Sequence, residues 1–313
     1  MRWIGRLAVS GLVLVLAAAL CLALFAWPSA LLVRWLFTGG NAELAARVQP
    51  YVAGDVERTL DVEYTDGESL DVLRPAGLDG ELPVVVWLHG GAWVGGDKSD
   101  VRPYLEVLAS QGRAVVGVNY SRAPGHEYPT PVRQAEEALD WVEEHADEHG
   151  LDPSRLVLAG DSAGAQIAVQ AAIEAPPGRL EGLLLQSGAF DPGWMVEELE
   201  GFSGRMVARA VSSYLEADDH DAARVVDHVT ADLPPVWLTS GDADPLHAQS
   251  VALVQRLEEL GIDVTAHLPR SRSGPPLGHE YQFDLALEDS VAALEGVRRF
   301  LDVVLSPGSE EPG

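Results

Sequence analysis

The feature that most constrains the fold is a short apolar run with no polar side. Val84–Leu88 reads Val-Val-Val-Trp-Leu, so an extended strand here is apolar on both faces. Such a strand has to be buried between two layers, and helices supply both layers in sheets built from parallel strands. The run therefore predicts an α/β protein.

Seven more strand patterns accompany this run, and helical patterns separate most of them. The eight candidate strands are Val56–Tyr64, Ser69–Arg74, Val84–Leu88, Ala114–Asn119, Arg155–Ala159, Leu180–Gln186, Val236–Ser240 and Val264–Leu268. Helical patterns lie at 99–111, 131–149, 163–175, 246–260 and 282–305, and 41–54 reads as a helix and linker. The alternation predicts a mostly parallel eight-stranded sheet flanked by helices, formed by one domain at 41–305. Residues 306–313 form a tail predicted to be disordered.

One connection is too long for this pattern. Residues 190–234 separate the sixth and seventh candidate strands, and long insertions in compact domains are usually lids or binding loops. The large apolar residues of the segment are Trp194, Met195, Phe202, Met206 and Tyr214. We expect a helical cap over a binding site.

The N-terminal segment, residues 1–40, reads as a membrane anchor with its juxtamembrane stretch. Leu7–Trp27 contains no charged residue and is long enough to span a bilayer as a transmembrane helix. Arg2 and Arg6 precede it and Arg34 follows, which favours a domain outside the cytoplasm. The alternative is a cleaved signal peptide and a secreted protein, but the run ends without a small-residue cleavage site.

Charge and cysteine content narrow the functional classes. The chain has 21 Lys and Arg against 48 Asp and Glu, a formal net charge of −27. Nucleic-acid binding needs a basic patch, so no nucleic-acid partner is expected. Cys21 is the sole cysteine, which excludes an intramolecular disulfide, and its place in the apolar run argues against a thiol nucleophile.

A candidate nucleophile lies at a strand-to-helix junction. Gly160-Asp161-Ser162-Ala163-Gly164 follows the strand Arg155–Ala159 and precedes a helical pattern. Glycines on both sides permit a sharp turn that exposes the Ser162 hydroxyl. The N-terminus of the following helix offers backbone N–H groups to a developing oxyanion. The alternative role for Ser162 is that of a simple helix N-cap.

A second loop supplies candidate oxyanion donors. His89-Gly90-Gly91-Ala92-Trp93 follows the strand Val84–Leu88, and its small residues let backbone N–H groups approach a substrate carbonyl. We expect His89 to order this loop rather than to transfer protons.

Two acids and two histidines compete for the remaining roles. Asp242 and Asp244 both follow the strand Val236–Ser240, and Pro245 biases Asp244 toward an extended conformation, which favours Asp244. His279 precedes the final helix, whereas His267 lies within a strand. The order Ser162, Asp244, His279 is the one expected of a nucleophile, an acid and a base on this kind of sheet.

Over residues 56–305 the sequence resembles the hormone-sensitive-lipase-like and related carboxylesterase branches of the α/β-hydrolases. The motifs that carry the resemblance are HGGAW at 89–93, GDSAG at 160–164, DADPL at 242–246 and GHEY at 278–281. The resemblance implies Ser162 as nucleophile, His279 as base and Asp244 as its orienting acid. It also implies an oxyanion hole at Gly90, Gly91, Ala92 and Ala163, where Ala92 replaces the third glycine of many members.

These expectations amount to a serine hydrolase that cleaves small to medium uncharged esters through an acyl-enzyme. Trp93, Trp194 and Phe202 are expected to line the substrate pocket. No cofactor or metal is implied, and His145 and His149 are expected on a solvated helix face. The alternatives are an amide, formamide, or acetyl- or feruloyl-sugar hydrolase with the same residues, or an inactive membrane-tethered binding module.

Overall fold

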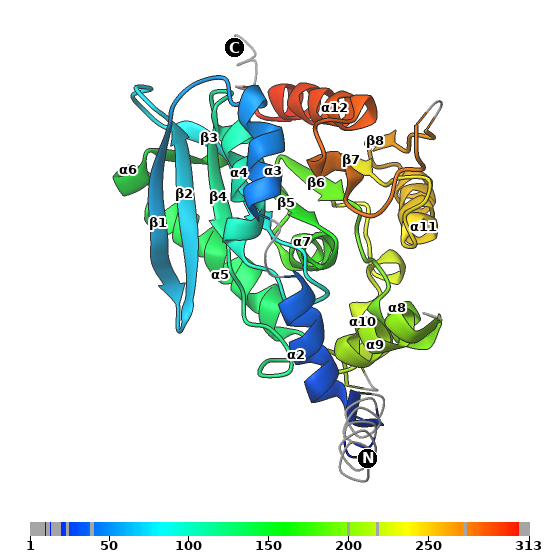
Figure 1. Ribbon diagram of the computed structural model, residues 1–313. Helices are drawn as coiled ribbons and strands as arrows, with labels where there is room; N and C mark the ends of the chain where they lie inside the picture. Colours follow the sequence, from blue (N-terminus) through cyan, green and yellow to red (C-terminus); the bar gives the residue numbers. More distant parts are fainter. Residues whose placement is uncertain are drawn as a thin grey trace.

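The computed structural model describes residues 10, 13, 20–22, 25–37, 41–198, 201–216, 219–271 and 274–306, with only the backbone at 41–43, 202 and 203. An eight-stranded sheet crosses the molecule in the order β1-β2-β4-β3-β5-β6-β7-β8 (Figure 1). The strands are β1 Val56–Thr65, β2 Glu68–Pro75, β3 Leu82–Leu88, β4 Ala114–Val118, β5 Leu151–Asp161, β6 Gly182–Gln186, β7 Val236–Thr239 and β8 Val264–His267. All eight predicted strands are confirmed, within a few residues at their ends.

The sheet is mixed rather than parallel throughout. The strands β3 to β8 pair in parallel, whereas β2 is antiparallel to both of its neighbours, β1 and β4. The pairing of β1 with β2 has a local reason: only Asp66 and Gly67 separate the two strands, and a two-residue connection can join only antiparallel strands. Gly67 has a φ of 77°, the left-handed conformation that such turns require.

Helices cover both faces of the sheet, as the apolar run at Val84–Leu88 predicts. Val84, Val86 and Leu88 pack into one core cluster, and Val85 and Trp87 pack into the other. The first cluster includes side chains of α5 (Thr130–Glu144), α7 (Ala163–Glu174) and α11 (His247–Glu259). The second includes side chains of α4 (Lys98–Ala109) and α12 (Glu288–Val304). Remaining helices are α3 (Asn41–Val48) and α6 (Ala146–His149), with short 3-10 turns η1 (Gln49–Tyr51) and η4 (Tyr281–Phe283).

The predicted insertion between the sixth and seventh strands is helical. It contains α8 (Pro192–Glu198), α9 (Gly201–Val211), α10 (His220–Ala223) and the turn η3 (Val225–Asp227). The helix α2 (Ala26–Phe37) packs against α9, and Figure 1 shows the two side by side. Arg34 on α2 donates to the carbonyl oxygens of Val94 (2.6 Å) and Ala123 (2.8 Å). The helix α2 is therefore joined to the α/β domain, although it belongs to the predicted N-terminal segment.

Most of the predicted anchor, Leu7–Trp27, lies outside the described residues. Within the part of the chain that is described, no helix has the length and apolar character needed to cross a bilayer. The predicted tail at 306–313 lies outside the described residues too, apart from Ser306.

Candidate active site

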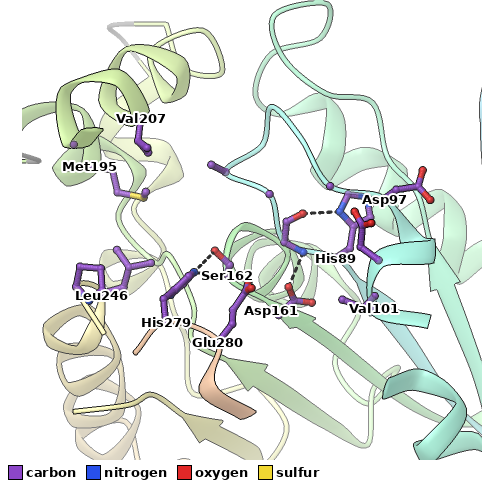
Figure 2. Close-up of a pocket in the computed structure, with 17 residues that line it drawn as sticks. His89, Asp97, Val101, Asp161, Ser162, Met195, Val207, Leu246, His279 and Glu280 are labelled. Carbon is purple, nitrogen blue, oxygen red and sulfur yellow. Dashed lines mark hydrogen bonds and ion pairs between the residues drawn. The ribbon is translucent and has the colours of Figure 1, made fainter. Parts of the chain in front are cut away.

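Ser162 occupies a strained turn between β5 and α7. Its φ of 50° and ψ of −117° are unusual for a residue with a side chain. Two hydrogen bonds hold the turn: the Ser162 N–H donates to the carbonyl of Gln186 (2.9 Å), and the Ser162 carbonyl accepts from the Ala189 N–H (3.0 Å). The conformation projects the Ser162 hydroxyl away from the helix axis and into a cavity (Figure 2).

The two glycines of the motif are required by close backbone contacts. A Cβ atom at Gly160 would lie 2.5 Å from the Gly164 carbonyl, and one at Gly164 would lie 2.0 Å from the Leu88 carbonyl oxygen. Real Cβ atoms do not approach so closely, so any larger residue would push α7 away from β3. The motif therefore sets the distance between Ser162 and the loop that follows β3.

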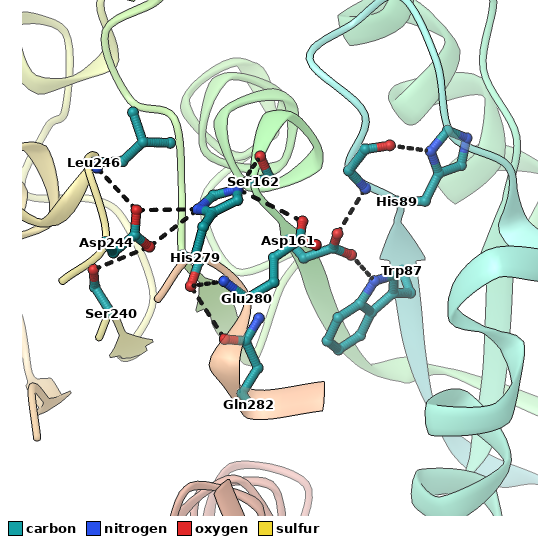
Figure 3. Close-up of polar contacts among 12 residues, drawn as sticks. Trp87, His89, Asp161, Ser162, Ser240, Asp244, Leu246, His279, Glu280 and Gln282 are labelled. Carbon is teal, nitrogen blue, oxygen red and sulfur yellow. Dashed lines mark hydrogen bonds and ion pairs between the residues drawn. The ribbon is translucent and has the colours of Figure 1, made fainter. Parts of the chain in front are cut away.

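Ser162, His279 and Asp244 form one hydrogen-bonded chain (Figure 3). The Nε2 atom of His279 lies 3.0 Å from the Ser162 Oγ, and its Nδ1 lies 3.1 Å from both carboxylate oxygens of Asp244. The buried Asp244 also accepts from the Leu246 N–H (2.8 Å), which fixes its carboxylate. This geometry lets His279 take a proton from Ser162 while Asp244 holds the ring.

The competing residues have other contacts. Asp242 accepts from the Leu277 N–H (2.9 Å) and so fastens the segment that carries His279. His267, at the end of β8, stacks on Trp237 with ring centroids 6.2 Å apart. Of the four competing residues, the structure brings Asp244 and His279 into one hydrogen-bonded chain with Ser162, and Asp242 and His267 lie outside it.

The surroundings of His279 stabilise its protonated form. Burial alone lowers the pKa of His279, but the hydrogen bond to Asp244 and the charges of Glu280, Asp244 and Asp161 outweigh burial and raise the pKa to about 9. The surroundings of His279 therefore favour an imidazolium cation at this position.

The loop after β3 presents backbone N–H groups beside Ser162. The N–H groups of Gly91, Ala92 and Ala163 donate to no acceptor in the described part of the chain. Gly91 has a φ of 125°, and a Cβ atom there would lie 2.3 Å from the Gly95 carbonyl oxygen, so the loop needs glycine. These three groups are placed to receive an oxyanion.

Gly90 differs from its predicted role. Its N–H donates to the Asp161 carboxylate at 2.8 Å and cannot serve a substrate at the same time. Gly90 therefore positions the loop, and the candidate oxyanion hole reduces to Gly91, Ala92 and Ala163.

His89 orders this loop, as expected. Its Nδ1 lies 2.6 Å from the Gly90 carbonyl oxygen, and its ring stacks on Tyr120 with centroids 4.5 Å apart. Burial lowers the pKa of His89 to about 4, although the hydrogen bond to Gly90 opposes the shift. A neutral, buried ring of this kind does not act as a proton carrier near neutral pH.

A cavity of about 370 Å³ opens in front of Ser162 (Figure 2). This volume is in the range of small-molecule sites. Met195 and Val207 of the insertion and Leu246 form an apolar wall, whereas Asp97 and Asp100 lie on the side of α4.

Sequence reasoning did not select Met195, Val207, Leu246, Asp161 or Glu280 as site residues. The sequence does contain a signal for two of them, because Asp161 directly precedes Ser162 and Glu280 directly follows His279.

The predicted aromatic pocket residues lie elsewhere. Trp93 is fully buried: its ring stacks on Tyr214 (5.0 Å), its Nε1 donates to Gln166 (3.0 Å), and it does not line the cavity. Trp194 packs against the core and does not line the cavity either. The Phe202 side chain lies outside the described part of the structure. Helix geometry explains the error: neighbouring side chains of a helix point about 100° apart, so Met195 faces the cavity and Trp194 does not.

Among the described residues, no three His, Cys, Asp or Glu side chains are grouped to hold a metal ion. His145 and His149, the pair with helical spacing, both pack against the ring of Trp141.

Comparisons with known proteins agree with this geometry. Residues 85–271 match the family model described as the alpha/beta hydrolase fold. The chain is 28% identical to esterase LipQ of Mycobacterium tuberculosis, over 86% of this chain and 70% of that protein. It is 30% identical to carboxylesterase NlhH of the same organism, over 66% of this chain and 70% of that protein.

Solved structures resemble the fold over most of its length. A thermostable esterase from Pseudomonas putida is 25% identical with a TM-score of 0.66, over 85% of this chain and 89% of that one. A hyperthermophilic esterase from Pyrobaculum calidifontis has a TM-score of 0.75 at 24% identity, over 88% and 93%. By sequence, fold and site, the chain belongs to the α/β-hydrolase fold family and, within it, to the esterases.

Proposed function

We propose that this carboxylic ester hydrolase cleaves small to medium uncharged esters through an acyl-enzyme on Ser162. One observation carries the proposal: Ser162 and His279, which form a hydrogen-bonded chain with Asp244, line one cavity with Gly91 and Ala92. The N–H of Ala163 directly follows Ser162 in the chain. A nucleophile, its base and an oxyanion hole are the parts that acyl transfer needs.

The mechanism follows from the distances. His279 removes the Ser162 proton as the hydroxyl oxygen attacks the ester carbonyl, and Asp244 stabilises the resulting imidazolium. The backbone donors receive the oxyanion, and His279 returns the proton to the departing alcohol. In the second half of the reaction His279 takes a proton from water as the water oxygen attacks the acyl-enzyme. His279 then returns the proton to the Ser162 oxygen, and the carboxylic acid leaves.

The cavity supports an uncharged substrate with an apolar group of modest length. Its volume of about 370 Å³ accommodates a short acyl or alkyl chain against Met195, Val207 and Leu246. The carboxylates of Asp97, Asp100 and Glu280 lie on the opposite side and would repel a negatively charged group.

Replacement of the nucleophile tests the proposal directly. Ser162→Ala removes the attacking oxygen, so kcat for p-nitrophenyl esters should fall by about 10³-fold or more with an unchanged melting temperature. A fluorophosphonate probe should label wild type and not the variant. Labelling of another serine would reject this assignment, and faster turnover of formamides or acetylated sugars than of esters would change the substrate class.

Replacement of Asp244 and of Asp242 should lower kcat to different extents in the same assay. Asp244→Asn leaves His279 with an amide partner that cannot stabilise the imidazolium, so kcat should fall by roughly 10⁴-fold, as in serine proteases. Asp242→Asn keeps an oxygen that can accept from the Leu277 N–H and should cost far less. The opposite ranking would show that Asp242 is the orienting acid.

The insertion between β6 and β7 should set the chain-length preference. Met195→Ala shortens a side chain of the apolar wall and so enlarges the cavity. The kcat/KM for longer acyl esters should therefore rise relative to that for acetyl esters, by about fourfold per added methylene until the space is filled. Val196→Ala is the matched control, because Val196 packs against the core and does not line the cavity. Identical profiles from acetyl to decanoyl esters in wild type and Met195→Ala would exclude a selective cap.

We also propose that Leu7–Trp27 anchors the enzyme in a membrane, with the catalytic domain outside the cytoplasm. The outward face of the adjoining α2 supports this: Trp27 and Trp35 are 61% and 69% exposed, and Leu31 lies between them. Tryptophan is favoured at the interface of a bilayer with water.

Fractionation distinguishes the anchor from a cleaved signal. Full-length protein should remain with membranes after an alkaline carbonate wash, because an inserted apolar helix is not released by charge or pH. A double variant with Leu14→Arg and Ala18→Arg, both within the apolar run, should be released. A mature protein that starts near residue 30 in the medium would refute the anchor.

A further inference from the structure

Two carboxyl groups adjoin the catalytic residues, and the mechanism above uses neither. Asp161 directly precedes Ser162 and is 1% exposed, and Glu280 directly follows His279. Glu280 has a φ of 57°, a strained conformation for this residue, and its N–H donates to the Ser187 hydroxyl (3.2 Å). The turn aims the Glu280 side chain back toward Asp161 (Figure 3).

The carboxyl groups of Asp161 and Glu280 share one small space. Both crowd Gly90, where a Cβ atom would lie 2.5 Å from the Asp161 Oδ2 and 2.9 Å from the Glu280 Oε1. Two carboxyl groups that share so small and buried a space do not both ionise, because each negative charge opposes the other, so one of them keeps a proton. Burial first, and the charge of Glu280 second, raise the pKa of Asp161 well above its ordinary value.

Asp161 is also the acceptor that holds the oxyanion loop. Its Oδ1 accepts from the Trp87 Nε1 (2.7 Å) and its Oδ2 accepts from the Gly90 N–H (2.8 Å). Gly90 immediately precedes Gly91 and Ala92, the loop's two free donors. The carboxyl group of Asp161 therefore ties the oxyanion loop to the strand that carries Ser162.

Glu280 lies against the other side of the site. Its Oε1 is 3.7 Å from the His279 Nε2, the nitrogen that faces Ser162. Among the described residues, no Lys or Arg forms an ion pair with Glu280 or Asp161, and the cation that contacts the pair is His279 in its protonated form. The other titratable or charged groups around the pair are Asp97, Asp100, His89, Tyr104, Tyr120, Arg122 and Asp244.

We propose that Asp161 and Glu280 are a positioning pair that shares one proton, in which Glu280 stabilises the His279 imidazolium and Asp161 fixes the oxyanion loop through Gly90. The pair holds its proton throughout turnover. The proton that His279 takes from Ser162 goes to the leaving alcohol, so no proton is gained or lost by the pair. This inference rests on the proposed acyl-enzyme mechanism.

The two members should have different kinetic signatures. Glu280→Gln leaves the negative charge of the pair on Asp161, which forms no ion pair with His279, instead of 3.7 Å from the His279 Nε2. The pKa of the histidine therefore falls, and the acid limb of kcat/KM moves to lower pH by about one unit. The same change should lower kcat on the plateau by about tenfold, because the imidazolium loses its stabilisation. A purely structural role would not move the acid limb.

Asp161→Asn should instead lower kcat and leave the acid limb in place. One amide oxygen cannot accept from both Trp87 and Gly90, and the amide NH₂ faces the donor that remains. The charge next to His279 stays, because Glu280 still carries it. We expect a loss of about 10²-fold in kcat with little change in KM, since the donors act mainly in the transition state.

Full-length wild type, both variants and Glu258→Gln, an exposed control on α11, are compared over pH 5 to 10 with a p-nitrophenyl ester. The control should match wild type. An acid limb that stays in place or rises in Glu280→Gln overturns the proposal, and so does full kcat in Asp161→Asn. If Glu280→Gln does not fold, Asp161→Asn still tests the proposal, which requires a lower kcat and an unmoved acid limb in this variant. Fluorophosphonate labelling separates failure of the positioning pair from failure of the proposed mechanism. If wild type is labelled and active but the acid limb of Glu280→Gln does not move, only the positioning pair is refuted. If Ser162 of wild type is not labelled, the acyl-enzyme mechanism is refuted.

Discussion

The contact on which the site depends is the close approach of α7 to β3. Gly164 allows the backbone of the helix to approach the Leu88 carbonyl oxygen at a distance that excludes any side chain. The same contact sets the positions of Ser162 at the start of the helix and of the loop that follows β3. Ser162 and the loop with Gly91 and Ala92 follow strands that are neighbours in the sheet, and the approach of α7 brings them to one cavity.

The sequence was sufficient for most of the fold because its patterns are local. A strand such as Val84–Leu88 has to be buried on both sides, and the observed sheet buries it between two clusters. The antiparallel pairing of β1 with β2 has a local signal too, the Asp66-Gly67 turn, which the alternation of strands and helices does not include. The three residues of the hydrogen-bonded chain were also predictable, since each follows a strand at the edge where parallel strands end.

Side-chain direction was harder to predict, and the reasons lie in particular residues. Ala92 and Trp93 both have positive φ, so the usual alternation fails there and the Trp93 ring enters the core instead of the cavity. Gly90 was expected to donate to a substrate, but a long-range partner, Asp161, occupies its N–H. In α8 a helical turn places Met195 toward Ser162 and Trp194 away from it, which residue type alone does not reveal.

The stacking of Trp93 on Tyr214 has a consequence for how such enzymes diverge. Trp93 belongs to the oxyanion loop, whereas Tyr214 belongs to the insertion, and Gln166 on α7 bonds both the Trp93 ring and the Ala223 carbonyl. The insertion is therefore not an interchangeable module. A chimera that takes its cap from a relative without an aromatic residue at position 214 would leave a void beside Trp93 and loosen the loop on which turnover depends. Recombination that changes specificity in this scaffold has to exchange the cap, the loop and the face of α7 together.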